Sequence, residues 1–251
     1  MHDLLTTALA TPGLIWLVLT IMAAGIVRGF AGFGTALIFV PIANIFLPTA
    51  DVIAVMVLTG ICSAAALLPR AVKVAELKDV SILGGAAILT VPIGLWIMTQ
   101  LPQDMIRWIA ALIAAAMLSA LILGWRYTGK IDLKRLLGIG AAAGGIGGMT
   151  GLTGPAVILF YLANGSRAEI VRANTIVFLA ILDVVIAINM TMGGLITWRL
   201  VALSFVLAVP YFITSRLGQA LFDPKYETTY RSMAYLVIGL AVVTGLPLWE
   251  E

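Results

Sequence analysis

Two glycine-rich clusters and an arginine in apolar surroundings are the parts of this sequence that could do chemistry. The first cluster runs Arg28-Gly29-Phe30-Ala31-Gly32-Phe33-Gly34-Thr35, and the second runs Gly148-Met149-Thr150-Gly151-Leu152-Thr153-Gly154-Pro155. Glycine lets the backbone approach a ligand closely, and a helix that starts after such a break offers free N–H groups and a partial positive charge. Arg28 adds a planar cation that can pair with an oxyanion. Together these features predict a site for a small anion.

The expected anion-binding residues come from both clusters, with threonine hydroxyls as further hydrogen-bond donors. They are Arg28, Gly29, Gly32, Gly34, Thr35, Gly148, Thr150, Gly151, Thr153, Gly154 and Asn164. For any single glycine, close packing of helices is an equally good explanation. Arg28 could equally donate to carbonyls of a broken helix. The occurrence of two clusters at equivalent positions favours a site.

Asp183 is the other ionisable residue that stands deep in an apolar stretch, residues 175–193. Charged groups at membrane depth are costly, so each is a functional candidate. Asp183 is a candidate carrier of a coupling proton; balancing Arg28 or capping a broken helix are the alternatives.

The elements that position these residues lie in a chain too apolar for a water-soluble protein. Of 251 residues, 62% are hydrophobic and only 11% are charged, with a mean hydropathy of +1.11. This composition excludes a disordered chain. A single cysteine and a single histidine exclude a disulfide scaffold and a Cys/His zinc site. The net charge of +3, spread over short loops, argues against a nucleic-acid partner. A polytopic membrane protein without cofactor remains.

Six apolar stretches have the length of about 20 residues that a membrane-spanning helix needs. They are residues 52–69, 79–100, 104–125, 175–193, 200–221 and 231–249. Two longer apolar regions, 13–47 and 136–164, are each interrupted by one of the glycine clusters, so each is expected to be helix, break, helix.

The distribution of Lys and Arg decides how these two regions run. If each crosses the membrane once, eight cations face one side and five the other. If each is a re-entrant hairpin, the numbers become eleven and two, which is the asymmetry typical of cytoplasmic and external loops. The eleven are Arg70, Lys73, Lys78, Arg126, Lys130, Lys134, Arg135, Arg167, Arg172, Lys225 and Arg231, and the two are Arg107 and Arg199. The hairpin arrangement also predicts both termini on the external side, and no cleaved signal peptide is expected.

An internal repeat is consistent with hairpins that enter from opposite faces. An offset of about 119–124 residues aligns Gly29 with Gly148, Asn44 with Asn164, and Gly94 with Gly218, in order. The expected fold is therefore an all-α polytopic membrane protein with two inverted repeats, residues 1–128 and 129–251. Each repeat is a re-entrant or broken hairpin followed by three transmembrane helices, a common transporter design in which the two tips meet near the midplane.

The two glycine motifs, Pro41, Asn164 and the two-repeat layout resemble the sulfite exporter TauE/SafE family of membrane permeases over essentially the whole chain. That resemblance implies transport of sulfite, sulfonates or related small anions across a bacterial inner membrane, with no enzymatic activity. Export is expected, because a negative cytoplasm drives anions outward. Proton-coupled uptake and an anion channel are the alternatives, and association into homo-oligomers is left open. An intramembrane enzyme is not expected, because the sequence has no HExxH or GxSxG motif and no paired carboxylates.

Overall fold

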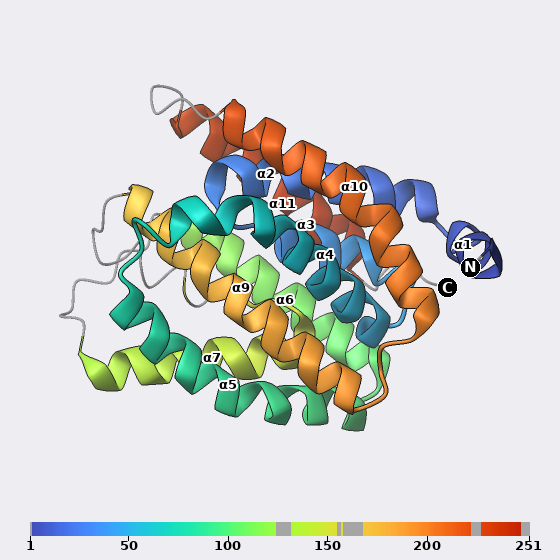
Figure 1. Cartoon of the computed structure of the whole chain (residues 1–251), viewed down its shortest axis with the longest axis horizontal. Helices are drawn as coiled ribbons and strands as arrows, with labels where there is room; N and C mark the ends of the chain where they lie inside the picture. Colours follow the sequence, from blue (N-terminus) through green and yellow to red (C-terminus); the bar gives the residue numbers. More distant parts are fainter. Residues whose placement is uncertain (1, 124–131, 155–156, 158–167, 222–226, 247–251) are drawn as a thin grey trace.

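The computed structural model of the chain describes residues 2–123, 132–154, 157, 168–221 and 227–246. Within these residues, every element of regular secondary structure is a helix. Figure 1 shows the arrangement. The helices are α1 (His2–Leu9), α2 (Leu14–Ala31), α3 (Thr35–Ala43), α4 (Thr49–Ala71), α5 (Leu77–Gln100), α6 (Gln103–Ile122), α7 (Leu133–Thr150), α9 (Ala168–Met192), α10 (Trp198–Ala220) and α11 (Glu227–Gly245). The predicted all-helical class is confirmed.

Among the described residues, four helices are long and apolar enough to cross a membrane. They are α5, α6, α9 and α10, at the predicted spans 79–100, 104–125, 175–193 and 200–221. The predicted spans 52–69 and 231–249 fall on α4 and α11, which are also apolar over Thr49–Ala65 and Tyr235–Gly245.

The chain folds back at the first glycine cluster. Helix α2 ends at Gly32 and α3 begins after Gly34, and these glycines have φ values of 81° and 101°. Only glycine adopts this left-handed region without strain, so the glycines at these two positions determine where the helix breaks. Gly13 lies directly against the ring of Phe46, which places the two ends of region 13–47 side by side.

The second cluster ends a helix in the same way. Helix α7 begins after Asp132, whose side chain accepts a hydrogen bond from the backbone N–H of Arg135 at 2.9 Å, and ends at Gly151 with a φ of 79°. Most of the predicted second arm, residues 155–156 and 158–164, lies outside the described part of the chain.

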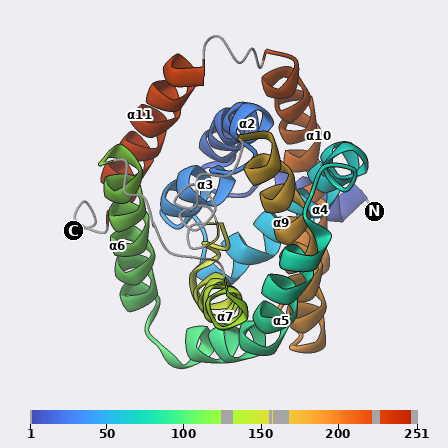
Figure 2. The ribbon, with the colours of Figure 1, turned by 90° about the vertical axis from the view of Figure 1, so that its left-hand side faces the viewer.

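The helices lie roughly along one long axis, and the two broken regions start from opposite ends of it. In Figure 1, α2 starts near α1 at the right, whereas α7 starts at the left, near the connection between α4 and α5. Figure 2 shows α2, α3, α7 and α9 enclosed by α5, α6, α10 and α11. Helix α2 packs mainly against α10, and α7 packs mainly against α5.

Glycine allows these two helix pairs to touch backbone to backbone. A Cβ added to Gly29 of α2 would overlap the carbonyl oxygen of Ser215, and one added to Gly218 of α10 would overlap that of Ile26. On the other pair, Gly148 of α7 faces the Val91 carbonyl of α5, and Gly94 faces that of Gly145. Small residues at such crossings let helices associate by close van der Waals contact in a bilayer, where no hydrophobic force brings them together.

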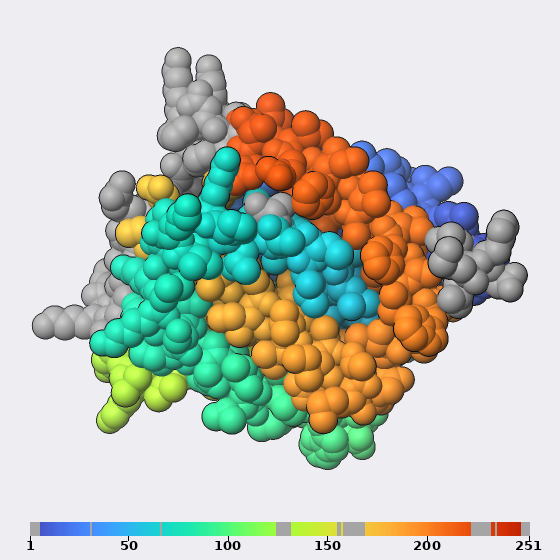
Figure 3. Space-filling view, viewed as in Figure 1, coloured from blue at the N-terminus to red at the C-terminus, as the bar shows by residue number. Residues whose placement is uncertain are grey.

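Large apolar side chains cover the outside of the molecule. Figure 3 views the face formed by α4, α5, α9 and α10. On α10 the exposed residues include Phe205, Val209 and Ile213, and on α5 Leu89 and Trp96 are also exposed. Such a surface suits a lipid environment rather than water.

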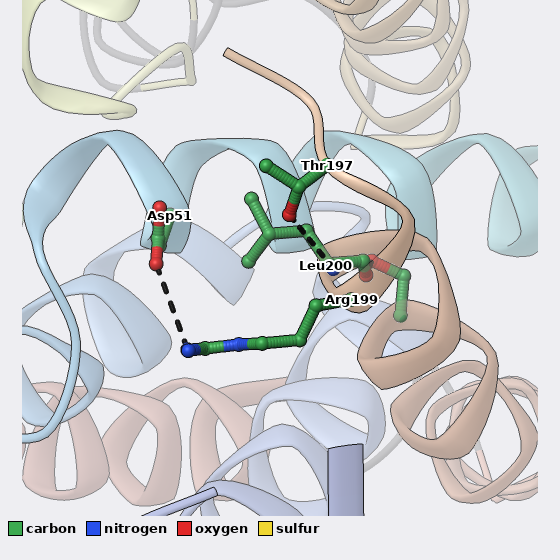
Figure 4. A network of polar contacts seen from close by, with 5 residues as sticks. Asp51, Thr197, Arg199 and Leu200 are labelled. Carbon is green, nitrogen blue, oxygen red and sulfur yellow. Dashed lines mark hydrogen bonds and ion pairs between the residues drawn. The ribbon is translucent and has the colours of Figure 1, made fainter. Parts of the chain in front are cut away.

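One ion pair joins α4 to α10 at the ends where both helices begin, as Figure 4 shows. Asp51 Oδ2 lies 3.8 Å from Arg199 Nη2, and both side chains are partly exposed. Thr197 caps α10 beside this pair by accepting a hydrogen bond from the backbone N–H of Leu200.

Candidate functional site

A small cavity lies where the two broken regions meet. Its walls come from α2, the first turn of α3, the Thr153–Gly154 segment after α7, and helices α4, α9 and α10. The lining residues are Arg28, Gly34, Thr35, Ala36, Leu37, Met56, Gly60, Thr153, Gly154, Leu179, Asp183 and Tyr211. The space open to the centres of water-sized groups is about 30 Å³. One water molecule needs about 10–15 Å³ of such space, so the cavity has room for about two.

Arg28 supplies the positive charge of this cavity. It stands in the last turn of α2, and only 4% of its surface is exposed. Its Nε and Nη2 atoms are buried without a hydrogen-bond partner in the described part of the chain. These two nitrogens form one edge of the guanidinium, the edge that binds two oxygens of an oxyanion side by side. Because a buried cation without partners is costly, this unpaired edge makes Arg28 a candidate for binding an anion.

The start of α3 adds backbone donors beside Arg28. The first hydrogen bond of this helix runs from the N–H of Ile38 to the carbonyl of Gly34, at 3.2 Å. The N–H groups of Thr35, Ala36 and Leu37 therefore precede the intrahelical ladder, and all three residues line the cavity. The positive end of the helix dipole also favours negative charge there.

Asp183 faces the same cavity from α9, with 5% of its surface exposed. Its carboxylate lies over Gly60 of α4, where a Cβ would overlap Oδ2. Arg28 lines the same cavity, and its Nε and Nη2 form no hydrogen bond with Asp183. The lining of the cavity therefore includes one cation and one acidic group.

Six lining residues were not expected from the sequence, and Tyr211 and Gly60 are the two among them with a specific contact to another lining residue. Tyr211 lies on α10 with 1% of its surface exposed, and its hydroxyl is 2.7 Å from Thr35 Oγ1. Gly60 is the residue that makes room for Asp183. Tyr211 could have been suspected because it lies inside a predicted span. A tyrosine hydroxyl that is buried there needs a polar partner. For Gly60 no local signal separates it from other small residues.

Six of the predicted site residues line the cavity, and five described ones do not. The six are Arg28, Gly34, Thr35, Thr153, Gly154 and Asp183, whereas Gly29, Gly32, Gly148, Thr150 and Gly151 lie outside the lining. Asn164 falls outside the described residues.

The five residues outside the lining shape the two breaks instead. Gly29 and Gly148 form the helix crossings. The carbonyl of Gly29 also accepts a hydrogen bond from Arg172 Nη2 at 2.6 Å, and Gly32 packs against the stem of Arg172. Thr150 donates to the Ile146 carbonyl at 2.8 Å, and the N–H of Gly151 donates to the Gly147 carbonyl.

The family of the chain follows from comparison with known proteins. Residues 17–245 match the family model for "Sulfite exporter TauE/SafE". The chain belongs to the TauE/SafE family. Neither the curated proteins nor the solved structures compared with it gave a match.

TauE/SafE membership makes this chain a multi-pass membrane transporter of sulfur anions and not an enzyme. The anionic substrate agrees in sign with the unpaired edge of Arg28. Within the described residues, no group of three or more His, Cys, Asp and Glu side chains could hold a metal ion.

Proposed function

We propose that this TauE/SafE protein is a secondary transporter that exports a small sulfur oxyanion, such as sulfite or an organosulfonate, and binds it in the cavity between the two glycine breaks. The observation that carries this proposal is the buried Arg28, whose Nε and Nη2 face no partner in the described part of the chain. Two oxygens of the anion pair with that edge. Thr35, Thr153, Gly34 and Gly154 surround the remainder of the anion.

Alternating access by two inverted repeats is the transport mechanism that we infer. The helix contacts support it. The repeat offset pairs Gly29 with Gly148 and Gly94 with Gly218; in the structure, Gly29 packs on Gly218 and Gly148 packs on Gly94.

The same offsets relate a second set of contacts one helical turn away. They pair Gly25 with Gly144 and Thr90 with Thr214, and here too Gly25 faces Thr214 while Gly144 faces Thr90. Two repeats that make equivalent crossings can exchange conformations and so open the central site to either face.

The membrane orientation that we propose places both termini on the periplasmic side of the inner membrane. The connections and adjoining helix ends that carry eleven of the cations then face the cytoplasm, as the positive-inside rule requires. Figure 1 shows the α4–α5 connection and the start of α7 at the same end of the molecule. This position supports placing their cations on one side of the membrane.

Export is favoured energetically over uptake. A negative cytoplasm drives each exported negative charge with about 2.3 kcal/mol per 100 mV, so export needs no coupled ion. Proton-coupled uptake is the second candidate, and the presence of Asp183 in the same cavity favours it. A protonated Asp183 would leave the charge of Arg28 unbalanced and ready for an anion.

Flux measurements in proteoliposomes test the proposal and separate these candidates. Sulfite, sulfoacetate, sulfate and chloride are compared under an imposed potential, with and without a pH gradient. Saturable flux of a sulfur anion that follows the potential supports the exporter. Flux that appears only with the pH gradient supports coupled uptake through Asp183, and unsaturable flux at pore-like rates indicates a channel.

The Arg28→Gln substitution tests the role of the cavity. A hydrogen bond to a charged group contributes about 1.5–3 kcal/mol, so loss of two should reduce anion affinity at least about 100-fold. Arg216→Gln is the matched control, because Arg216 is an exposed residue on α10 that stacks over Phe212 at 5.5 Å. Normal sulfite flux by a correctly inserted Arg28→Gln protein would refute the proposed site.

A further inference from the structure

The cavity contains a pair of hydroxyl groups that are hydrogen-bonded to each other and come from two different helices. Thr35 is the first residue of α3, and Tyr211 lies in the middle of α10, 176 positions further along the chain. Their oxygens are 2.7 Å apart, both residues line the cavity, and either can be the donor. The pair therefore joins the first glycine break to a helix of the other half of the chain.

The number of hydrogens in this pair has a chemical consequence. Each hydroxyl carries one hydrogen, and the bond between them uses one of the two. If Thr35 donates to Tyr211, the phenolic hydrogen remains; if Tyr211 donates, the threonine hydrogen remains. The threonine hydrogen is then free to bind a ligand in the cavity, whereas the phenolic hydrogen can go to a ligand or to the nearby Ser63 hydroxyl, which is buried without a partner in the described part of the chain. The unpaired edge of Arg28 offers two more donors in the same cavity.

We propose that the Thr35–Tyr211 pair determines specificity by donating a third hydrogen bond to an anion whose other two oxygens are bound by Arg28. This inference rests on the proposed anion site. A sulfite or sulfonate head has three oxygens in a pyramid, so all three donors are used at once. A carboxylate has two oxygens in one plane, and when both bind Arg28 no third oxygen is left for the hydroxyl. The pair thus selects three-oxygen heads over two-oxygen heads.

The size of the preference follows from the energy of one hydrogen bond to a charged group. One such bond corresponds to a ratio of affinities of about 10- to 100-fold. Methanesulfonate and acetate are the suitable probes, because both carry one negative charge and one methyl group and differ in the head. Their binding to the purified protein in nanodiscs is measured by calorimetry at pH 7.5.

Four variants separate the contribution of the pair from those of its members. Tyr211→Phe and Thr35→Val each leave one hydroxyl, and each should retain part of the preference for methanesulfonate. The double variant leaves none, and its ratio of affinities should approach unity. Tyr235→Phe on α11 removes a phenol that does not line the cavity and should behave as the unmodified protein.

The outcomes distinguish this inference from the proposed function. A double variant that still binds both anions and keeps the full preference overturns the specificity role and leaves the anion site standing. If the unmodified protein binds neither anion, the anion site itself is wrong, and the inference falls with it. Should Thr35→Val prevent folding of the double variant, Thr35→Ala removes the hydroxyl without a branched side chain. Comparing Tyr211→Phe/Thr35→Ala with Tyr211→Phe/Thr35→Ser then gives the same test.

Discussion

Replacement of two glycines on helix α7 by alanine should change the stability of the protein in opposite directions. Gly145 and Gly148 lie three residues apart on the same helix. A Cβ at Gly148 would lie 2.5 Å from the carbonyl oxygen of Val91 and 3.1 Å from the backbone nitrogen of Leu95 on α5. A Cβ at Gly145 would have nothing within 4 Å. The two substitutions are chemically identical and differ only in what the added methyl group meets.

The expected free energies follow from this difference. Alanine is better than glycine in a helix interior by about 0.5–1 kcal/mol, because glycine loses more conformational entropy on folding. Gly145→Ala should therefore stabilise the protein by about that amount. Gly148→Ala makes the same gain, but α5 must move away from α7, and overpacking of this kind costs about 1–3 kcal/mol. The propensity gain is common to both, so the difference between the variants is the packing cost alone.

The difference in stability between the two variants is measured by thermal unfolding in the same detergent. Fluorescence of the six tryptophans monitors the unfolding. For a chain of this size, 1 kcal/mol corresponds to about 2–4 °C in Tm. Gly145→Ala should raise the Tm and Gly148→Ala should fall at least about 2 °C below it. Gly29→Ala on α2 should behave like Gly148→Ala, because it meets the backbone of α10 in the same way. Equal Tm values for Gly145→Ala and Gly148→Ala would refute the close crossing of α5 and α7.

Two further substitutions test contacts around the cavity and at the end of the bundle. Gly60→Ala should displace the Asp183 carboxylate and lower the free energy of unfolding by about 1–3 kcal/mol. It should also alter the effect of a pH gradient on sulfite flux. Gly85→Ala is the control, because a Cβ there meets nothing within 4 Å. Unchanged stability and flux in Gly60→Ala would contradict the contact. Asp51→Asn should change the free energy of unfolding by less than about 1 kcal/mol, because the partly exposed pair with Arg199 is weak. A larger loss of stability in thermal unfolding would show that this ion pair contributes more than a surface ion pair does.

The helices of the fold were predictable because the signals that start and stop them are local. The span expected at 79–100 is α5, Leu77–Gln100, and the one expected at 200–221 is α10, Trp198–Ala220. The largest difference is at α9, expected from residue 175, which begins at Ala168. Its first turns carry Glu169 and Arg172 and continue the helix beyond the apolar stretch. A hydropathy boundary marks where a helix leaves the hydrocarbon, and not where its backbone hydrogen bonds end.

The candidate site was predictable in its charges and in its breaks, and less so in its individual glycines. Arg28 was expected to be a site residue because a cation is costly in an apolar region, and it does line the cavity. Gly34 and Gly29 belong to one cluster, yet Gly34 lines the cavity whereas Gly29 packs on α10. Both are glycines, so their different roles depend on where they lie: Gly29 is inside α2 at its crossing with α10, whereas Gly34 follows the break and precedes α3.

The sequence by itself determined the apolar helices, the two glycine breaks, the family and the buried cation, because each is a property of composition or of a short motif. The tertiary structure decided which of these residues share a cavity. Thr35 meets Tyr211 across 176 positions, and Gly60 of α4 makes room for Asp183 of α9. Such contacts depend on how far each helix is rotated and where it crosses the next. Those quantities arise from the packing of all the helices together, and no single segment of the chain contains them.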